Sequence, residues 1–212
     1  LNPWIFLVLA VGSLALFFKL HQALLNLLSR ILKLDNQHKD YSSVLFENIG
    51  SARNLEELAR KSINALLNSI NCSNADFLIF RMEKNGFVVS YSATGKSYSV
   101  PLNEPFLKNF QPDIEMYERE LVSIDPRFQN IKEEAQNYFR HYGAEIVIPL
   151  YFEQELPVLI HISRKMDNTA FTSRDFALLS AFRNVLFMQL NSIILFEKDR
   201  EARQTLRELD LA

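Results

Sequence analysis

Histidine and cysteine are the side chains that most often bind metals or carry out catalysis, and this sequence has four histidines and one cysteine. No histidine stands in a metal-ligand spacing such as HExxH, and no second cysteine completes a CxxC pair with Cys72. We therefore expect Cys72 to be a buried, unreactive thiol. The histidines are spread along the chain, at His21, His38, His141 and His161.

Phosphate-binding loops are also missing from the pattern, because the chain has only five glycines and they form no glycine-rich loop. The sequence thus predicts no catalytic residue, no metal site and no cofactor, and we expect this part of the protein to be non-enzymatic. A longer protein that contains it is expected to carry any enzymatic domain downstream.

Composition sets the broad class of protein. The chain has 212 residues with a net charge of −2, and 48% of them are hydrophobic. This is enough to build one globular core with helical extensions. The near-neutral charge, without a long basic run, argues against nucleic acid as a partner. A single cysteine excludes a disulfide framework and is compatible with a reducing compartment.

An uncharged stretch, 4–18, opens the chain and predicts a membrane segment, with Trp4 as an interfacial anchor. It is shorter than the roughly 20 residues needed to span a bilayer, so residues 1–19 are interpreted as a transmembrane helix truncated upstream. The cations that follow place the remaining chain in the cytoplasm by the positive-inside rule, at the inner membrane. The alternative is a buried helix of a soluble dimer. The cations are Lys19, Arg30, Lys33 and Lys39.

Two heptad patterns bracket the middle of the chain and predict coiled coils that form a homodimer. The first lies in a stalk helix over 20–49, and the second lies in one long helix from Thr172 to Ala212 that begins with a Thr172/Asp175 cap. From 197 on, this helix is highly charged and is interpreted as the start of an outgoing linker. The alternative is a solvated amphipathic helix. The seam positions are Leu20, Leu24, Leu27, Ile31 and Leu34, and then Val185, Met188, Leu195, Ala202, Leu206 and Leu209.

The region 50–196 predicts an α+β domain in which helices pack on an antiparallel sheet. A capped helix from Asn54 is followed by three strands around the turn at Asn85, then by a segment with helix starts at 103–105 and at Asp125, and then by a hairpin over 144–163. A short strand is also expected at 121–124, and the helix from Asp125 is expected to continue to Tyr142 and to stop at Gly143.

The closing part of this domain resembles a GAF domain. The matching elements are Ile148-Pro149-Leu150 in a strand, Ser163-Arg164-Lys165 after the next strand, and Phe171-Thr172 with Asp175, Leu178 and Leu179 at the opening of the last helix. Upstream of Gln129, only the order of elements is similar. Pro157 and Ser163 stand where the family usually has glycine, and Pro157 is expected at the start or edge of a strand because it has no N–H.

The resemblance implies a sensing or dimerisation module of a bacterial signalling protein. The plan of membrane helix, stalk, GAF domain and outgoing helix is similar to proteins whose output domain is a phosphatase, kinase or cyclase. The tail from Leu206 to Ala212 looks like the linker that enters SpoIIE-type serine phosphatases. The expected partners are a second copy of the chain, the membrane, an output domain in the same chain and a small molecule of unknown identity.

GAF domains bind ligands between the sheet and the helices that join its central strands, which here corresponds to about 103–143. This segment is rich in aromatic side chains. An apolar cavity with few polar groups suits a small ligand. The candidate ligand-binding residues are Tyr91, Tyr98, Met116, Phe128, Tyr138, His141 and Tyr142.

Two alternatives remain open for this segment. The aromatic side chains can fill the cavity themselves, which would make the domain a ligand-free dimerisation adaptor. The second alternative is that His141 binds haem. A simpler role for His141 is at the end of a helix, where a cation complements the helix dipole.

Overall fold

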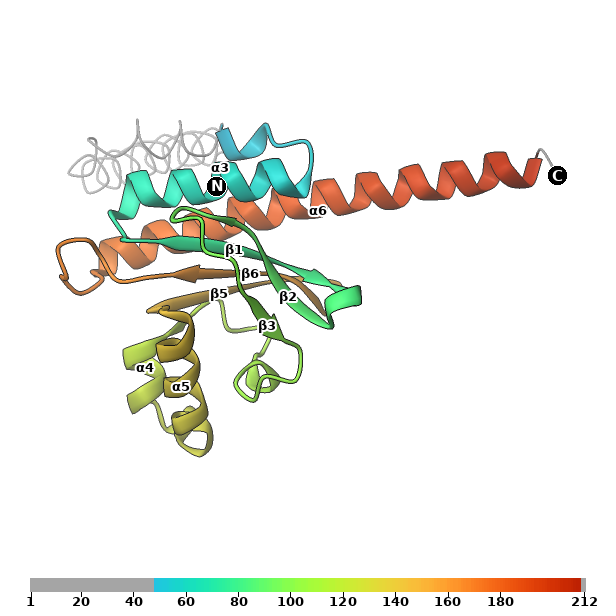
Figure 1. The fold of residues 1–212 in the computed structure, drawn as a ribbon. Helices are drawn as coiled ribbons and strands as arrows, with labels where there is room; N and C mark the ends of the chain where they lie inside the picture. Colours follow the sequence, from blue (N-terminus) through green and yellow to red (C-terminus); the bar gives the residue numbers. More distant parts are fainter. Residues whose placement is uncertain (1–47, 211–212) are drawn as a thin grey trace, which may run out of the picture. The chain divides into compact units, whose positions relative to one another are not determined.

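A six-stranded antiparallel sheet forms the centre of the computed structural model, which describes residues 48–210. The strand order is β3-β2-β1-β6-β5-β4 (Figure 1). The predicted three-strand meander and the second hairpin are both confirmed. The strands are β1 (Ala75–Arg81), β2 (Gly86–Ser92), β3 (Ser99–Pro101), β4 (Tyr117–Glu118), β5 (Ile146–Phe152) and β6 (Glu155–Ile162).

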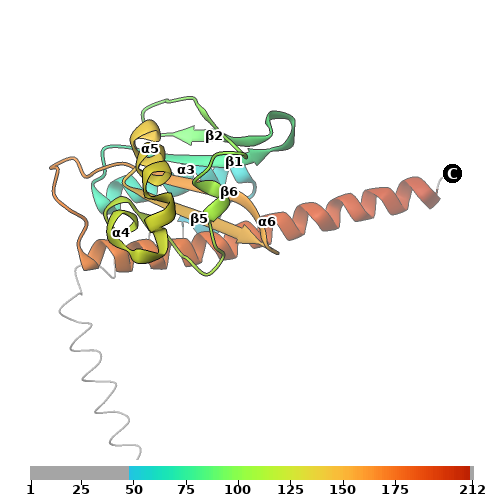
Figure 2. The same cartoon turned by 90° about the horizontal axis from the view of Figure 1, so that it is seen from below.

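Helices cover both faces of this sheet (Figures 1 and 2). The long helices α3 (Leu55–Ile70) and α6 (Ser173–Asp210) lie on one face, where they share a hydrophobic core with alternate residues of the central strands. The shorter helices α4 (Arg119–Ile124) and α5 (Lys132–Tyr142) lie on the other face, over a second core rich in aromatic residues. Because side chains alternate along a strand, β5 contributes Ile146 and Ile148 to the first core and Val147 to the second.

The capping signals in the sequence define the starts of the two long helices. The Asn54 side chain accepts a hydrogen bond from the backbone N–H of Glu57 at 2.8 Å, which fixes the start of α3. At α6, Thr172 and Asp175 form a capping box, and the rings of Phe171 and Phe176 lie 6.2 Å apart as a hydrophobic staple. Both predicted caps are confirmed.

Helix α6 changes character along its length. Its buried side chains are spaced three and four residues apart, from Leu179 to Ile193, and they pack on the first core. From Leu195 to Gln204, the side chains that the structure describes are exposed. Within residues 48–210, the part Ser173–Gln204 of this helix is long and apolar enough to cross a membrane by length and composition. Packing on the first core buries 28% of the apolar window of this helix.

The segment between β3 and α5 differs from the expectation. The predicted helix start at 103–105 leads only to a 3₁₀ turn, Leu107–Asn109, and the strand predicted at 121–124 is wrong because this stretch is helical in α4. Asp125 does start a helix, with its carboxylate accepting from the N–H of Arg127 at 2.9 Å, but Pro126–Ile131 is 3₁₀ before α5 begins. In α4, Val122 is buried whereas Leu121 and Ile124 are exposed. Four residues are too few for a hydrophobic pattern to distinguish a strand from a helix.

Pro157 lies near the start of β6, as expected. The pairing of β6 with β1 ends at Val158, and the pairing with β5 is interrupted between Leu150 and Phe152, opposite the proline. A residue without an N–H is thus accommodated at a place where the ladder is irregular. The predicted membrane segment at 4–18 and the stalk seam from Leu20 to Leu34 lie outside the described residues.

Candidate functional site

A polar network is buried in the second core, on the face of the sheet that α4 and α5 cover. Asp76 of β1 and His161 of β6 are cross-strand partners, and both are only 1% exposed. Ionisable side chains are rarely buried to this degree without hydrogen-bond partners. We call this set the His161 network: Asn74, Asp76, Tyr98, Tyr138 and His161.

Both ring nitrogens of His161 are hydrogen-bonded to tyrosine hydroxyls. The Tyr98 hydroxyl lies 2.8 Å from Nδ1 of His161 and 2.9 Å from Oδ2 of Asp76, and the Tyr138 hydroxyl lies 2.7 Å from Nε2. A carboxylate only accepts, so the single proton of Tyr98 goes to Asp76 when Asp76 is ionised. The Nδ1–H of His161 then donates to Tyr98, and Nε2 accepts from Tyr138. Every group in this part of the network is satisfied by one neutral tautomer of His161.

Burial keeps the His161 imidazole and the hydroxyls of Tyr98 and Tyr138 uncharged. It lowers the pKa of His161 to about 3, so the imidazole is neutral at pH 7. Burial raises the pKa of Tyr98 far above its usual value, and the nearby charge of Asp76 adds to the effect. Burial also raises the pKa of Tyr138 well above its usual value. Because both nitrogens of His161 are occupied, the network offers no free base at neutral pH, and its arrangement suits positioning rather than proton transfer.

The network continues to the end of the sheet through Asn74. Its amide nitrogen donates to Oδ1 of Asp76 at 2.9 Å, and its amide oxygen accepts from both the N–H and the hydroxyl of Thr94 at 3.2 Å. Thr94 lies just after β2, so a connected set of hydrogen bonds runs from the loop after β2 to the middle of α5.

Three of the predicted ligand residues surround His161. The Tyr142 ring lies 5.5 Å from Tyr98, 4.7 Å from Tyr138 and 5.6 Å from His161, measured between centroids. Phe128 belongs to the same core but lies in another part of it, with its ring 5.8 Å from Tyr117. The structure therefore gathers Tyr98, Tyr138 and Tyr142 into one group.

Tyr91 and Met116 lie on the opposite face of the sheet, against the core of α3 and α6. Tyr91 lies on this face because of a β-bulge in β2. Phe77 pairs with Tyr91 and Leu78 pairs with Val89, so Ser90 is the extra residue and the alternation of faces shifts by one. The Tyr91 hydroxyl accordingly reaches Asn64 of α3, at 3.4 Å.

His141 is exposed, and with Tyr138 and Tyr142 it lines an open hollow of about 410 Å³ along α5. Glu104 lies on the same hollow. The pKa of its carboxyl is raised, because the effect of partial burial is larger than the opposing effect of His141. Among residues 48–210, no group of three or more His, Cys, Asp and Glu side chains is placed to hold a metal ion.

Aromatic side chains occupy the space between the sheet and α5. The Phe106 ring is in contact with four others, with centroids 5.0 Å from Phe110, 5.5 Å from Tyr117, 5.1 Å from Tyr138 and 5.4 Å from Phe139. Phe106, Tyr117, Tyr138 and Phe139 are all buried. Such edge-to-face and tilted pairs are favourable arrangements of aromatic rings.

Sequence reasoning missed the centre of this site. His161 was expected only as a strand residue, and neither Asp76 nor Asn74 was singled out. The available signal was a single polar residue inside an apolar strand, Asp76 in ADFLIFR and His161 in ELPVLIHI. A buried polar residue needs a partner, so two of them on neighbouring strands predict a network. Cys72 is buried as expected, and burial raises the pKa of its thiol to about 11.

The comparisons with known proteins concern structure alone. No family model matches the sequence, and no curated protein matches it. Among solved structures, residues 122 to 287 of a methyl-accepting chemotaxis protein match 72% of this chain and 98% of their own length, with 12% identity and a TM-score of 0.53.

Two further structures show the same likeness. The GAF domain of an Acinetobacter phosphoenolpyruvate-protein phosphotransferase matches 74% of this chain and 94% of its own, with 13% identity and a TM-score of 0.51. The bacteriophytochrome RpBphP3 of R. palustris matches 82% of this chain but only 41% of its own length, with 11% identity and a TM-score of 0.59. The described residues therefore have a GAF-like fold, with a six-stranded antiparallel sheet flanked by helices and a long C-terminal helix.

Proposed function

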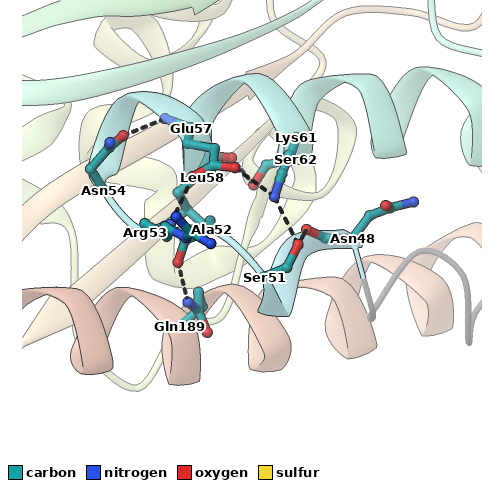
Figure 3. A network of polar contacts seen from close by, with 10 residues as sticks. All are labelled: Asn48, Ser51, Ala52, Arg53, Asn54, Glu57, Leu58, Lys61, Ser62 and Gln189. Carbon is teal, nitrogen blue, oxygen red and sulfur yellow. Dashed lines mark hydrogen bonds and ion pairs between the residues drawn. The ribbon is translucent and has the colours of Figure 1, made fainter.

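We propose that the chain is a dimeric regulatory module that relays a signal from its entering segment to helix α6 and on to an output domain. The observation that carries this proposal is the contact between these two parts. The side-chain amide of Gln189 in α6 donates a hydrogen bond to the backbone oxygen of Ala52 at 2.6 Å (Figure 3). A shift of the segment before α3 therefore acts directly on the middle of α6.

The entering segment is itself fixed to α3. Lys61 contacts Ser51 and Glu57, each at 2.7 Å, and Glu57 accepts from the N–H of Arg53 at 2.9 Å (Figure 3). Ile49 is fully buried in the first core. The segment 48–54, the start of α3 and the middle of α6 thus form one connected layer, which suits the transmission of a rigid displacement.

The proposed dimer uses the exposed apolar side chains of α6. Met188 is 63% exposed and Leu195 is 55% exposed, and they lie on the predicted heptad seam with the half-buried Val185 and the exposed Ala202. Large apolar side chains in this spacing suit a parallel coiled coil. We propose in addition that residues 4–18 tether the module to the inner membrane with the domain in the cytoplasm, and that the output is a phosphatase of the SpoIIE type, a kinase or a cyclase.

A relay of this kind requires two arrangements of α6 with similar free energies. A ligand or a membrane signal shifts the equilibrium only by its difference in affinity for the two arrangements. The open hollow beside Tyr138, Tyr142 and His141 is the place where we propose a small molecule acts.

Light scattering on the purified chain tests the dimer. We expect the double variant Met188→Glu/Leu195→Glu to dissociate at a higher protein concentration than the parent, because it places charges in the apolar seam of α6 and leaves only the predicted stalk seam to hold the dimer. Arg200→Glu changes the net charge by the same amount at an exposed position of α6 outside this seam, and it is expected to leave the dimer intact. A parent chain that is monomeric well above micromolar concentration would contradict the proposal.

The aromatic packing around Phe106 supports a second candidate, a ligand-free dimerisation adaptor. In this case the rings of the second core leave no room for a ligand between the sheet and α5. This candidate shares the dimer with the first, but it predicts no change in helix spacing or thermal stability with any metabolite that targets this core.

A further inference from the structure

A second hollow, of about 420 Å³, lies at the end of the sheet where β1 begins and β6 ends. Its lining is strongly basic. Four cationic residues and one acidic residue line it, and the cations come from four separate segments: the loop after β2, the start of α4, the last turn of α5 and the end of β6. We call it the basic hollow; its charged residues are Lys96, Arg119, Arg140, Arg164 and Glu145.

Most of this positive charge is not balanced by protein carboxylates. Arg119 is paired with Glu145, with Nη1 and Oε1 3.0 Å apart. For the side chains of Lys96, Arg140 and Arg164, the structure of residues 48–210 shows no ion pair and no hydrogen bond. An isolated surface cation is ordinary, and Arg140 also stands in the last turn of α5, where a cation complements the helix dipole. Neither explanation accounts for three unpaired cations that converge on one concave site.

Neutral hydrogen-bonding groups lie among the cations on a rigid floor. Ser73, Ser163 and Thr94 line the hollow. The floor is held by backbone hydrogen bonds, from the N–H of Ser73 to the oxygen of Arg164 at 2.8 Å and from the N–H of Ser163 to the oxygen of Asn74 at 2.9 Å. A site of this kind is preformed, which reduces the cost of ordering it around a ligand.

We infer that the basic hollow binds a small ligand that carries a phosphate group. The guanidinium groups of Arg140 and Arg164 match the oxygens of a phosphate in a two-bond geometry, and Lys96 adds a point charge. A single carboxylate would neutralise only one of these three cations, whereas a phosphate ester or diphosphate carries two or more charges. The volume is within the range of sites that hold small molecules.

The ligand would also contact one end of the His161 network. Asn74 and Thr94 line the hollow, and the Asn74 amide donates to Asp76 at 2.9 Å. A phosphate bound at this end can therefore change the hydrogen bonds of Thr94 and Asn74 and, through them, the position of Asp76. Binding itself is independent of the relay, but a role of this ligand as a signal rests on the proposed function.

Isothermal titration calorimetry on the purified 212-residue chain tests the inference, with inorganic pyrophosphate, inorganic phosphate and succinate as probes at constant ionic strength. We expect pyrophosphate to bind most tightly and succinate most weakly. Arg140→Ala and Arg164→Ala should each weaken pyrophosphate binding about tenfold or more. Arg164→Lys keeps the charge but loses the two-bond geometry, so it should fall between the parent and Arg164→Ala.

Arg60→Ala is the matched control, because Arg60 is an exposed arginine on α3, on the other side of the sheet. It should bind pyrophosphate as the parent does. Circular dichroism verifies that each variant is folded. The inference is overturned if pyrophosphate releases no heat of binding, if succinate binds more tightly than pyrophosphate, or if Arg60→Ala weakens binding as much as Arg164→Ala. None of these results bears on the dimer, which light scattering measures separately.

Discussion

Replacing Tyr98 by phenylalanine tests whether the His161 network stabilises the fold as its geometry indicates. The change removes one hydroxyl and leaves the ring in place. The Oδ2 atom of Asp76 loses the hydrogen bond that the Tyr98 hydroxyl donates to it at 2.9 Å, and the Nδ1–H of His161 loses the same hydroxyl as its acceptor at 2.8 Å. A hydrogen bond to a charged group contributes about 1.5–3 kcal/mol, and a buried donor without a partner costs about 1–3 kcal/mol.

We therefore expect Tyr98→Phe to lower the free energy of unfolding by about 3 kcal/mol at pH 7. Tyr91→Phe is the matched control. The Tyr91 hydroxyl makes a long 3.4 Å contact with Asn64 near the surface, so its removal should change stability by less than about 0.5 kcal/mol. Urea unfolding followed by circular dichroism measures both values, and the slope with urea should stay constant. If the two variants were equally stable, the network would not stabilise the fold and our reasoning would be refuted.

Three further predictions concern pH and packing. The pKa of His161 is lowered to about 3, so the unfolded chain binds one more proton than the folded chain between about pH 3 and pH 6.5. The free energy of unfolding should therefore fall by about 1.5 kcal/mol between pH 6.5 and pH 5 because of this one side chain. His161→Gln should remove this contribution from the pH dependence of urea unfolding. Gly86→Ala should lower the free energy of unfolding in urea by about 1–3 kcal/mol, because the added Cβ would lie 2.5 Å from the backbone oxygen of Val100. Gly50→Ala is the control: its Cβ would have no atom within 4 Å, so the loss should be far smaller. Phe182→Ala should lower the melting temperature strongly, with a loss of about 3–5 kcal/mol, because the ring is 1% exposed under α6, while a loss below about 1 kcal/mol would contradict the packing described for this helix.

The sequence predicts the architecture well where the signals are local. The caps at Asn54 and Thr172, the hairpins and the stop at Gly143, where φ is +67°, depend on a few neighbouring residues, and all were predicted correctly. The stretch 103–131 was predicted poorly, because its 3₁₀ turns and the two-residue β4 are set by tertiary packing around Phe106. Short elements carry too little periodicity to be distinguished.

The candidate site was predicted only in part, for reasons of register. Tyr98, Tyr138 and Tyr142 meet at His161 because Tyr98, just before β3, and the two tyrosines of α5 pack into the core on the same face of the sheet. Tyr91 does not join them because one extra residue, Ser90, turns it to the other face. Nothing local in the sequence marks this bulge. The pairing of Asp76 with His161 depends on the register of two strands that are distant in sequence, so it follows from the assembled sheet.

The most direct test of the relay is the distance between the two copies of α6, measured by pulsed electron paramagnetic resonance. A spin label on Arg200→Cys reports this distance, since Arg200 is exposed and lies outside the dimer seam, and the native Cys72 is buried. Helices packed in a coiled coil lie about 8–10 Å apart, so we predict one short and narrow distance distribution in the parent. Gln189→Leu removes the hydrogen bond to Ala52 and should shift or broaden this distribution. The relay would be contradicted if the distance distribution were the same in both proteins, or if no dipolar coupling between the labels of two copies were detected.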